Sequence, residues 1–149
     1  MSQSLSHLVI HIIFSTKHRR PLLRPDKVRC EIYAYLAGTL KNVGCDPIKI
    51  DGTADHVHIL SSLSKTVALA DLIQRLKGSS SKVLKEKGIR GFNWQNGYGA
   101  FSVSESNVAS VAAYVDNQEK HHRKLTFQEE FRALLQKHRV AFDEQYLWD

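Results

Sequence analysis

The run at residues 8–14 constrains the fold more than any other part of the sequence. It is short, rich in β-branched residues and apolar at successive positions, which is typical of a strand in the middle of a sheet. It is far too short to span a bilayer, and His11 interrupts it. A basic loop at residues 17–21 follows it directly. We therefore expect a sheet built around this strand.

Four later segments have the apolar spacing of helices. Gly44 and Gly88 follow two of them and suit helix ends, and Thr126 with Glu129 forms a capping box at the start of the last. The third helix is expected to begin at Ser104 or Ser106, either of which can cap it. The expected helices span about residues 25–43, 66–87, 104–121 and 126–138.

Further strand patterns lie between these helices. Asp51-Gly52 is a turn signal between residues 48–50 and 56–60, which predicts a hairpin. Residues 92–103, with Asn96-Gly97 in the middle, are expected to form strand–turn–strand. The order β-α-β-β-α-β(β)-α-α predicts an α+β fold, with helices packed on one face of an antiparallel sheet in a ferredoxin/RRM-like sandwich. We expect one domain over residues 1–149.

Composition adds weaker constraints. The formal net charge is +6, from 21 Lys+Arg against 15 Asp+Glu, which favours a polyanionic partner without requiring one. Cys30 and Cys45 have no metal-ligand spacing and are expected to be reduced thiols in a cytoplasmic protein. Residues 1–6 are polar and uncharged, unlike a signal peptide, and no membrane partner is expected.

The triplet His56-Val57-His58 is the first candidate for chemistry. Alternate side chains of a strand share a face, so the two imidazoles would lie side by side with Val57 turned into the core. Such a pair is half of a metal site. Chance is the competing explanation, because the chain contains eight histidines.

Tyr114 and Gln118 are the second candidate. They are four residues apart in an expected helix and would lie on the same flank, although a packed tyrosine and a solvated amide would give the same pattern. Combined with His56 and His58, these two residues indicate a reaction centre, because the Gln118 carbonyl oxygen could complete a metal site near the Tyr114 hydroxyl. A divalent ion polarises a phosphoryl oxygen, and a tyrosinate can attack the phosphorus without any nucleotide cofactor.

The ordered set of motifs resembles the single-tyrosine HUH transposases of the insertion sequence 200/605 group. The resemblance spans nearly the whole chain and keeps all four key positions. Rolling-circle initiators typically have lysine where Gln118 stands, and conjugative relaxases place the tyrosine before the histidine motif. The matching segments are residues 17–21, 55–60, 76–80, 94–102 and 114–122.

The resemblance implies a specific reaction. Mg²⁺ or Mn²⁺ would be held by His56, His58 and Gln118. Tyr114 would form a 5′-phosphotyrosine at a hairpin-containing end of single-stranded DNA and release a 3′-hydroxyl. A homodimer built around paired sheets is also implied, in which Tyr114 could act in trans through a flexible stretch at residues 99–106. A domesticated relative acting on chromosomal repeats and a non-catalytic nucleic-acid-binding protein remain alternatives.

Two basic clusters are candidates for contact with DNA phosphates, although charge runs are often only solvated faces. Tyr98, between two glycines, is the candidate for stacking on a base, whereas Trp94 and Phe101 are expected in the core. The phosphate-contact candidates are Lys17, Arg19, Arg20, Arg75, Lys77, Lys82 and Lys85.

Other polar residues have less specific expectations. His121 could assist proton transfer, but a solvated helix end is the simpler interpretation. Asp55 could tune a metal ligand from behind it, but it precedes His56 on the strand and is expected to face away from it, in a turn. His7 and His11 share a strand face and are expected to serve the core or DNA rather than a metal.

Overall fold

A computed structural model describes residues 2–122 and 124–149 of the chain. Its four strands form one antiparallel sheet in the order β2-β3-β1-β4. β1 pairs with both β3 and β4, so the apolar run that opens the sequence is central, as predicted. The strands are β1 (Val9–Ser15), β2 (Pro47–Gly52), β3 (His56–Ser62) and β4 (Gly99–Val103).

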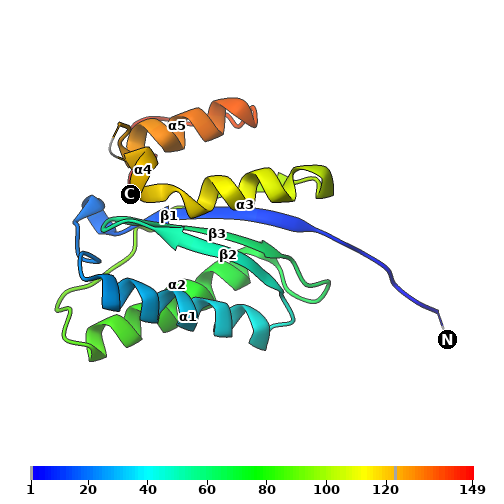
Figure 1. Ribbon diagram of the computed structural model, residues 1–149, viewed down its shortest axis with the longest axis horizontal. Coiled ribbons are helices and arrows are strands. Elements are labelled where there is room, and N and C mark those ends of the chain that lie inside the picture. Colours follow the sequence, from blue (N-terminus) through cyan, green and yellow to red (C-terminus); the bar gives the residue numbers. More distant parts are fainter. Residues whose placement is uncertain (1, 123) are drawn as a thin grey trace.

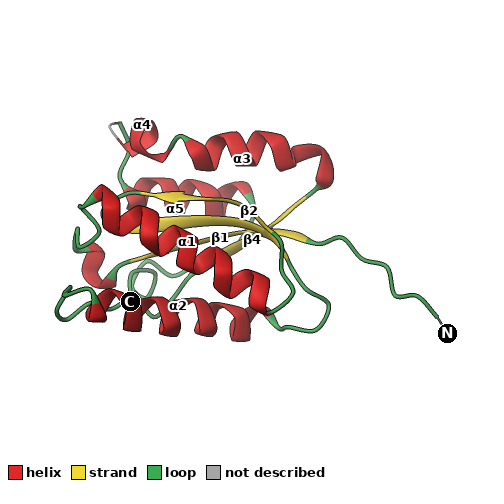
Figure 2. Cartoon of the chain, turned by 60° about the horizontal axis from the view of Figure 1, so that its bottom comes forward, coloured by secondary structure: helices red, strands yellow, loops and turns green. Residues whose placement is uncertain are grey.

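One face of the sheet is covered by α1 (Asp26–Asn42) and α2 (Leu69–Glu86), which lie below it in Figure 1. Figure 2 shows the two helices side by side across this face. Ile12 and Phe14 of β1 point into the core between the sheet and these helices, together with Leu36 of α1. This is the main apolar core of the molecule.

The other face is covered by the C-terminal helices, α3 (Val108–Asp116), α4 (Gln118–His122) and α5 (Phe127–Lys137) (Figure 1). The α+β class and the antiparallel sheet are therefore confirmed, but the expected one-sided packing holds only for α1 and α2. The reason lies in β1 itself: Ile13 packs with α5, opposite to its neighbours Ile12 and Phe14. Both faces of the central strand are apolar, so both need a cover.

Two local expectations differ from the structure. Residues 92–98 contain no strand; Trp94 forms only an isolated bridge with Thr16. The expected helix over residues 104–121 is divided into a short 3-10 turn (Glu105–Asn107), α3 and α4, with a break at Asn117, whose φ of −108° and ψ of 26° are not helical. The capping box of Thr126 and Glu129 at the start of α5 is confirmed.

Gly99 explains how α5 approaches the sheet. A Cβ atom at this position would overlap with the Phe131 ring of α5 and lie 2.9 Å from Ile13. Because Gly99 has no side chain, the buried ring of Phe131 packs directly on the sheet. Residues 99–103 are thus a paired strand rather than the flexible connection expected from their composition. Among the described residues, no helix is long and apolar enough to cross a membrane.

Candidate metal and nucleophile site

The histidine pair lies on the face of the sheet that the C-terminal helices cover. His56 and His58 are fully buried on β3, with ring centroids 5.2 Å apart. Val57, between them, points into the core on the opposite face. The side-by-side imidazoles predicted from strand alternation are therefore present.

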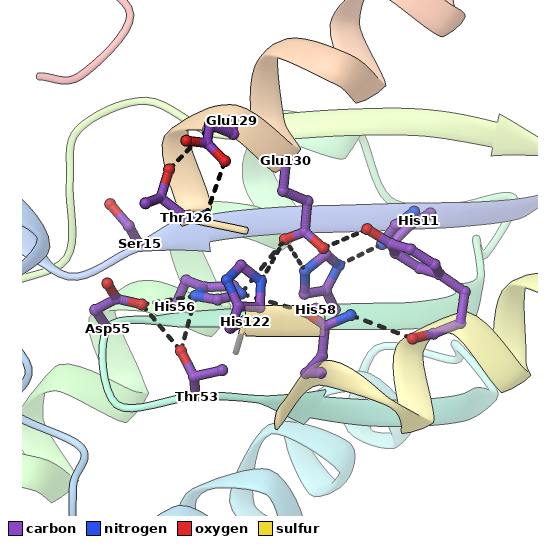
Figure 3. Close-up of polar contacts among 12 residues, drawn as sticks. His11, Ser15, Thr53, Asp55, His56, His58, His122, Thr126, Glu129 and Glu130 are labelled. Carbon is purple, nitrogen blue, oxygen red and sulfur yellow. Dashed lines mark hydrogen bonds and ion pairs between the residues drawn. The ribbon is translucent and has the colours of Figure 1, made fainter. Parts of the chain in front are cut away.

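Glu130 of α5 extends from the helix toward the sheet, and its carboxylate faces the imidazoles (Figure 3). Its carboxylate is 1% exposed, and Oε1 accepts from His58 Nε2 at 2.8 Å and from His122 Nε2 at 3.0 Å. His56 Nε2 is 3.5 Å from the same oxygen. One ligand atom from each of these four residues lies within 4.8 Å of the others, so the cluster is compact enough to surround a metal ion.

Gln118 reaches the same site from the first residue of α4. Its side chain is fully buried, and Oε1 lies 3.3 Å from His56 Nε2. Its amide nitrogen donates to the backbone oxygen of Tyr114 at 3.2 Å. The carbonyl oxygen therefore faces the histidines, as a ligand would, although Gln118 and Tyr114 belong to two helices rather than one.

Tyr114 is half-buried at the end of α3, and its hydroxyl donates to Glu130 Oε2. Its ring centroid is 5.9 Å from that of His58 in the same chain and 4.6 Å from that of His121. A cavity of about 600 Å³ between β4, α3 and α5 is lined by Tyr114 and Glu130, together with Lys137 and other residues. The hydroxyl thus lies where this cavity meets the histidine cluster.

A further layer of residues orients the two histidines. His56 Nδ1 lies 2.7 Å from Asp55 Oδ1 and 2.9 Å from the Thr53 hydroxyl. The expectation that Asp55 faces away from His56 was wrong, because a neighbouring side chain can fold back at the turn where the strand begins. A carboxylate on Nδ1 directs Nε2 toward a ligand position. Asp55 also accepts from Thr53 in the turn, at 2.9 Å.

His11 of β1 orients His58, with 2.7 Å between His11 Nε2 and His58 Nδ1. Because a carboxylate only accepts, the neutral His58 donates to Glu130 through Nε2 and accepts from His11 through Nδ1. A metal ion on Nε2 would require the opposite tautomer. His11 can accommodate it, because a neutral imidazole can also accept.

Burial and hydrogen bonding shift the pKa values of these groups in different directions. Burial lowers the pKa of His58 to about 4 and that of His11 to about 3. Burial also opposes the charged form of His56, but hydrogen bonds with Asp55 and Glu130 raise its pKa to about 9. Despite burial, its bonds to the imidazoles hold the pKa of Glu130 below the usual range. Burial and the Glu130 charge raise the pKa of Tyr114.

The DNA-contact candidates lie in two places. Lys17, Arg19 and Arg20 follow β1 beside the His56 end of β3, where the Thr16 amide donates to the Asp55 carbonyl at 2.8 Å. The others lie on or beside α2, across the sheet from the histidine cluster. Of these, Arg75, Lys82 and Lys85 are exposed and Tyr98 is 38% exposed.

Lys77 is engaged within the protein. Its ammonium donates to the backbone oxygens of Gln95, Asn96 and Gly97 at 2.8, 3.2 and 2.6 Å, so contact with a phosphate would compete with these bonds. The expected core positions of Trp94 and Phe101 agree with the structure, where they are 5% and 4% exposed.

His122 and Glu130 were not recognised as site residues in the sequence. One signal was present for Glu130: it lies on the apolar face of α5, between Phe127 and Leu134, where a charged residue is costly unless it is paired. His122 gave no such signal. Its approach to the cluster depends on the break at Asn117, which no local pattern predicts.

Comparison with known proteins supports one family. The sequence model described as "Transposase IS200 like" matches residues 4–118. The chain belongs to the IS200-like transposase family. Transposition and DNA binding are therefore the activities of its group. The match with the IS200-like transposases contains His56, His58, Tyr114 and Gln118, and it ends before the two residues that the sequence did not reveal.

Individual relatives agree with this assignment. The ISDra2 transposase TnpA of Deinococcus radiodurans is 30% identical over 118 residues, covering 74% of this chain and 84% of that protein. A crystal structure from that organism, described as that of a transposase, is 25% identical with a TM-score of 0.61, over 79% of this chain and 98% of that one. The structure of a REP-associated tyrosine transposase bound to a REP hairpin is 12% identical with a TM-score of 0.60. The match covers 82% of this chain and 74% of that one, and it supports the fold alone.

Proposed function

We propose that this IS200-like transposase cuts and rejoins single-stranded DNA through a covalent bond to Tyr114. The observation that carries the proposal is that the Tyr114 hydroxyl bonds to Glu130, whose other oxygen contacts the buried His58 beside His56 and Gln118. A tyrosine oxygen that attacks phosphorus conserves the phosphodiester energy in a phosphotyrosine. The DNA strand would leave with a free 3′-hydroxyl, which can later attack the phosphotyrosine and rejoin the strand.

The donor set fits a divalent cation. His56, His58 and Gln118 present two imidazole nitrogens and one amide oxygen toward one region, and the Asp55 and His11 contacts hold the imidazoles in place. Mn²⁺ suits this mixed set better than Mg²⁺, which prefers oxygen ligands. When bound, the ion would polarise a phosphoryl oxygen and neutralise developing charge.

The proposed substrate is single-stranded DNA with a hairpin near the cut. The strand must place one phosphate at Tyr114, and the half-buried hydroxyl beside a cavity can receive an unpaired strand more easily than a duplex. Lys17, Arg19 and Arg20 could hold the backbone near the His56 end of the site. Binding should weaken steeply with salt, and equal cleavage of a paired duplex would contradict the proposed selectivity.

The tyrosine is proposed to act on the histidine pair of its own chain. Tyr114 lies beside His58 within one chain, and residues 99–107 before α3 form strand β4 and a short 3-10 turn rather than a flexible stretch, which disfavours exchange between subunits. Excision still needs two cuts, so we propose a homodimer with one cis site in each subunit. A mixed dimer of Tyr114→Phe and His56→Ala should then stay inactive, whereas recovery of about half the activity would establish the trans arrangement.

The nucleophile is tested by trapping the covalent adduct. Protein is incubated with a labelled hairpin end and Mn²⁺, and denaturing electrophoresis then detects DNA that remains attached. The native chain and Tyr146→Phe should form the adduct, since Tyr146 is 65% exposed and outside the site. Tyr114→Phe should form none. An adduct with Tyr114→Phe would show that another residue attacks.

A further inference from the structure

Glu130 is a buried carboxylate whose burial requires compensating interactions. It is 1% exposed, and a carboxylate without compensating charge is costly to bury. Its nearest partners are three imidazoles: His58 and His122 bond to Oε1, and His56 approaches the same oxygen. Burial keeps His58 neutral, and the positive charge of His56 is shared with Asp55, whose Oδ1 lies 2.7 Å from His56 Nδ1. A divalent cation among these side chains would supply the further positive charge that two buried or half-buried carboxylates need.

We propose that Glu130 is a metal ligand of this site and also holds the Tyr114 hydroxyl beside the metal. The inference rests on the proposed metal-dependent function and adds a ligand to it. Glu130 lies beyond residues 4–118, which match the family, so the shared motif does not include it. The C-terminal helix α5 thereby becomes part of the reaction centre.

The ligand chemistry favours this assignment. Two imidazoles and a neutral amide form a weak site for Mg²⁺ or Mn²⁺, because both ions prefer carboxylate oxygens. With Glu130 the donor set becomes two histidines, the Gln118 amide oxygen and one carboxylate, which still leaves positions open for a substrate on an ion with six ligands. Glu130 Oε1 is 2.8 Å from His58 Nε2, closer than the 3.3 Å between Gln118 Oε1 and His56 Nε2.

The second oxygen of Glu130 connects the Tyr114 hydroxyl, the proposed nucleophile, to the proposed metal site. Oε1 faces the imidazoles, while Oε2 accepts from the Tyr114 hydroxyl. One carboxylate therefore fixes the position of the tyrosine relative to the histidine cluster. Because Phe131, the next residue of α5, is packed against Gly99, the backbone that carries Glu130 is anchored to the sheet.

The test measures Mn²⁺ binding to the full chain by isothermal titration calorimetry at one pH. Glu130→Gln keeps the size of the side chain but removes its charge, and it should weaken Mn²⁺ binding at least about tenfold, since even residues behind the ligands are worth about 10–100-fold. Stabilisation of the chain by Mn²⁺ in thermal melts should fall in parallel. Glu129→Gln is the matched control, because Glu129 is exposed on the same helix and Gln preserves a capping box.

Four other outcomes are decisive. Unchanged Mn²⁺ affinity in Glu130→Gln would overturn the inference, and tighter binding would also overturn it by showing that Glu130 competes with the metal. If Glu130→Gln does not fold, Glu130→Asp answers the same question, because it keeps the charge but withdraws the carboxylate; affinity equal to the native chain would overturn the inference. His56→Ala distinguishes failure of the Glu130 inference from failure of the proposed function. If His56→Ala binds Mn²⁺ as tightly as the native chain, the proposed metal site itself is wrong.

Discussion

Acid should destabilise the metal-free chain in a pH range set by His11 and His58. Both are buried and neutral in the fold, with pKa values lowered to about 3 and about 4 from an ordinary 6.5. Below pH 6.5 the unfolded chain takes up protons at both residues while the folded chain does not. Stability is therefore lost as the pH falls from 6.5 toward 4.

The size of the effect follows from these values. At pH 5 each histidine costs about 2 kcal/mol, so the pair costs about 4 kcal/mol, a large part of the 5–15 kcal/mol typical of a domain. His56 acts in the opposite direction: its pKa is raised to about 9, so the stability it contributes is present below 6.5 and is lost as the pH rises through 9. Stability in chelator should peak near pH 6.5.

Urea denaturation in chelator between pH 5 and pH 9 measures this profile. The matched variant is His11→Gln, whose amide can still donate to His58 but cannot titrate. Its loss of stability between pH 6.5 and pH 5 should be about half that of the native chain. An equal loss in the variant, or a native profile that is flat over this range, would refute the reasoning. Added Mn²⁺ should move the peak to higher pH, because metal ligands must be deprotonated.

Three further predictions concern packing and DNA contact. Phe131→Ala should lower the free energy of unfolding by about 3–5 kcal/mol in urea; a loss below about 1 kcal/mol would mean that this ring does not hold α5. Gly99→Ala should lower the melting temperature through a clash worth about 1–3 kcal/mol. Gly78→Ala places its new methyl group where nothing lies within 4 Å, so it should add about 0.5–1 kcal/mol of helix stability and raise the melting temperature. Equal changes of melting temperature in the two variants would contradict the packing at Gly99. Lys82→Ala should reduce the salt dependence of DNA binding by about one phosphate contact without loss of stability, whereas Lys77→Ala should destabilise the fold. An unchanged salt dependence in Lys82→Ala would remove that residue from the interface.

Local patterns predicted the elements of the fold better than their arrangement. The central strand, the hairpin of residues 48–60 and the capping box at Thr126 depend on neighbouring residues, and all three are present. The turn of the hairpin lies at residues 53–55 rather than at Asp51-Gly52, because both of these residues pair with β3. The side of the sheet on which the C-terminal helices pack was wrong, although the sequence held the reason. A strand that is apolar on both faces, at Ile12 and Ile13, requires layers on both sides.

The site residues show the same contrast between local patterns and the packing of distant segments. The placement of His56 beside His58 follows from strand alternation, which depends only on the backbone. Gln118 reaches the cluster even though the helix breaks at Asn117, so the four-residue spacing gave the correct location without the correct local structure. Glu130 is brought to His58 by the docking of a separate helix. No spacing rule connects residues so far apart in the sequence.

The position of Glu130 in the chain has a consequence during protein synthesis. The cluster combines His11 of β1, His56 and His58 of β3 and Glu130 of α5, and therefore needs residues from nearly the whole sequence. Translation delivers α5 after all four strands, when the sheet can already form. A nascent chain would thus carry the tyrosine and both histidines without the carboxylate that joins them. If Glu130 is a ligand, the proposed reaction centre is complete only after α5 has left the ribosome and docked on the sheet.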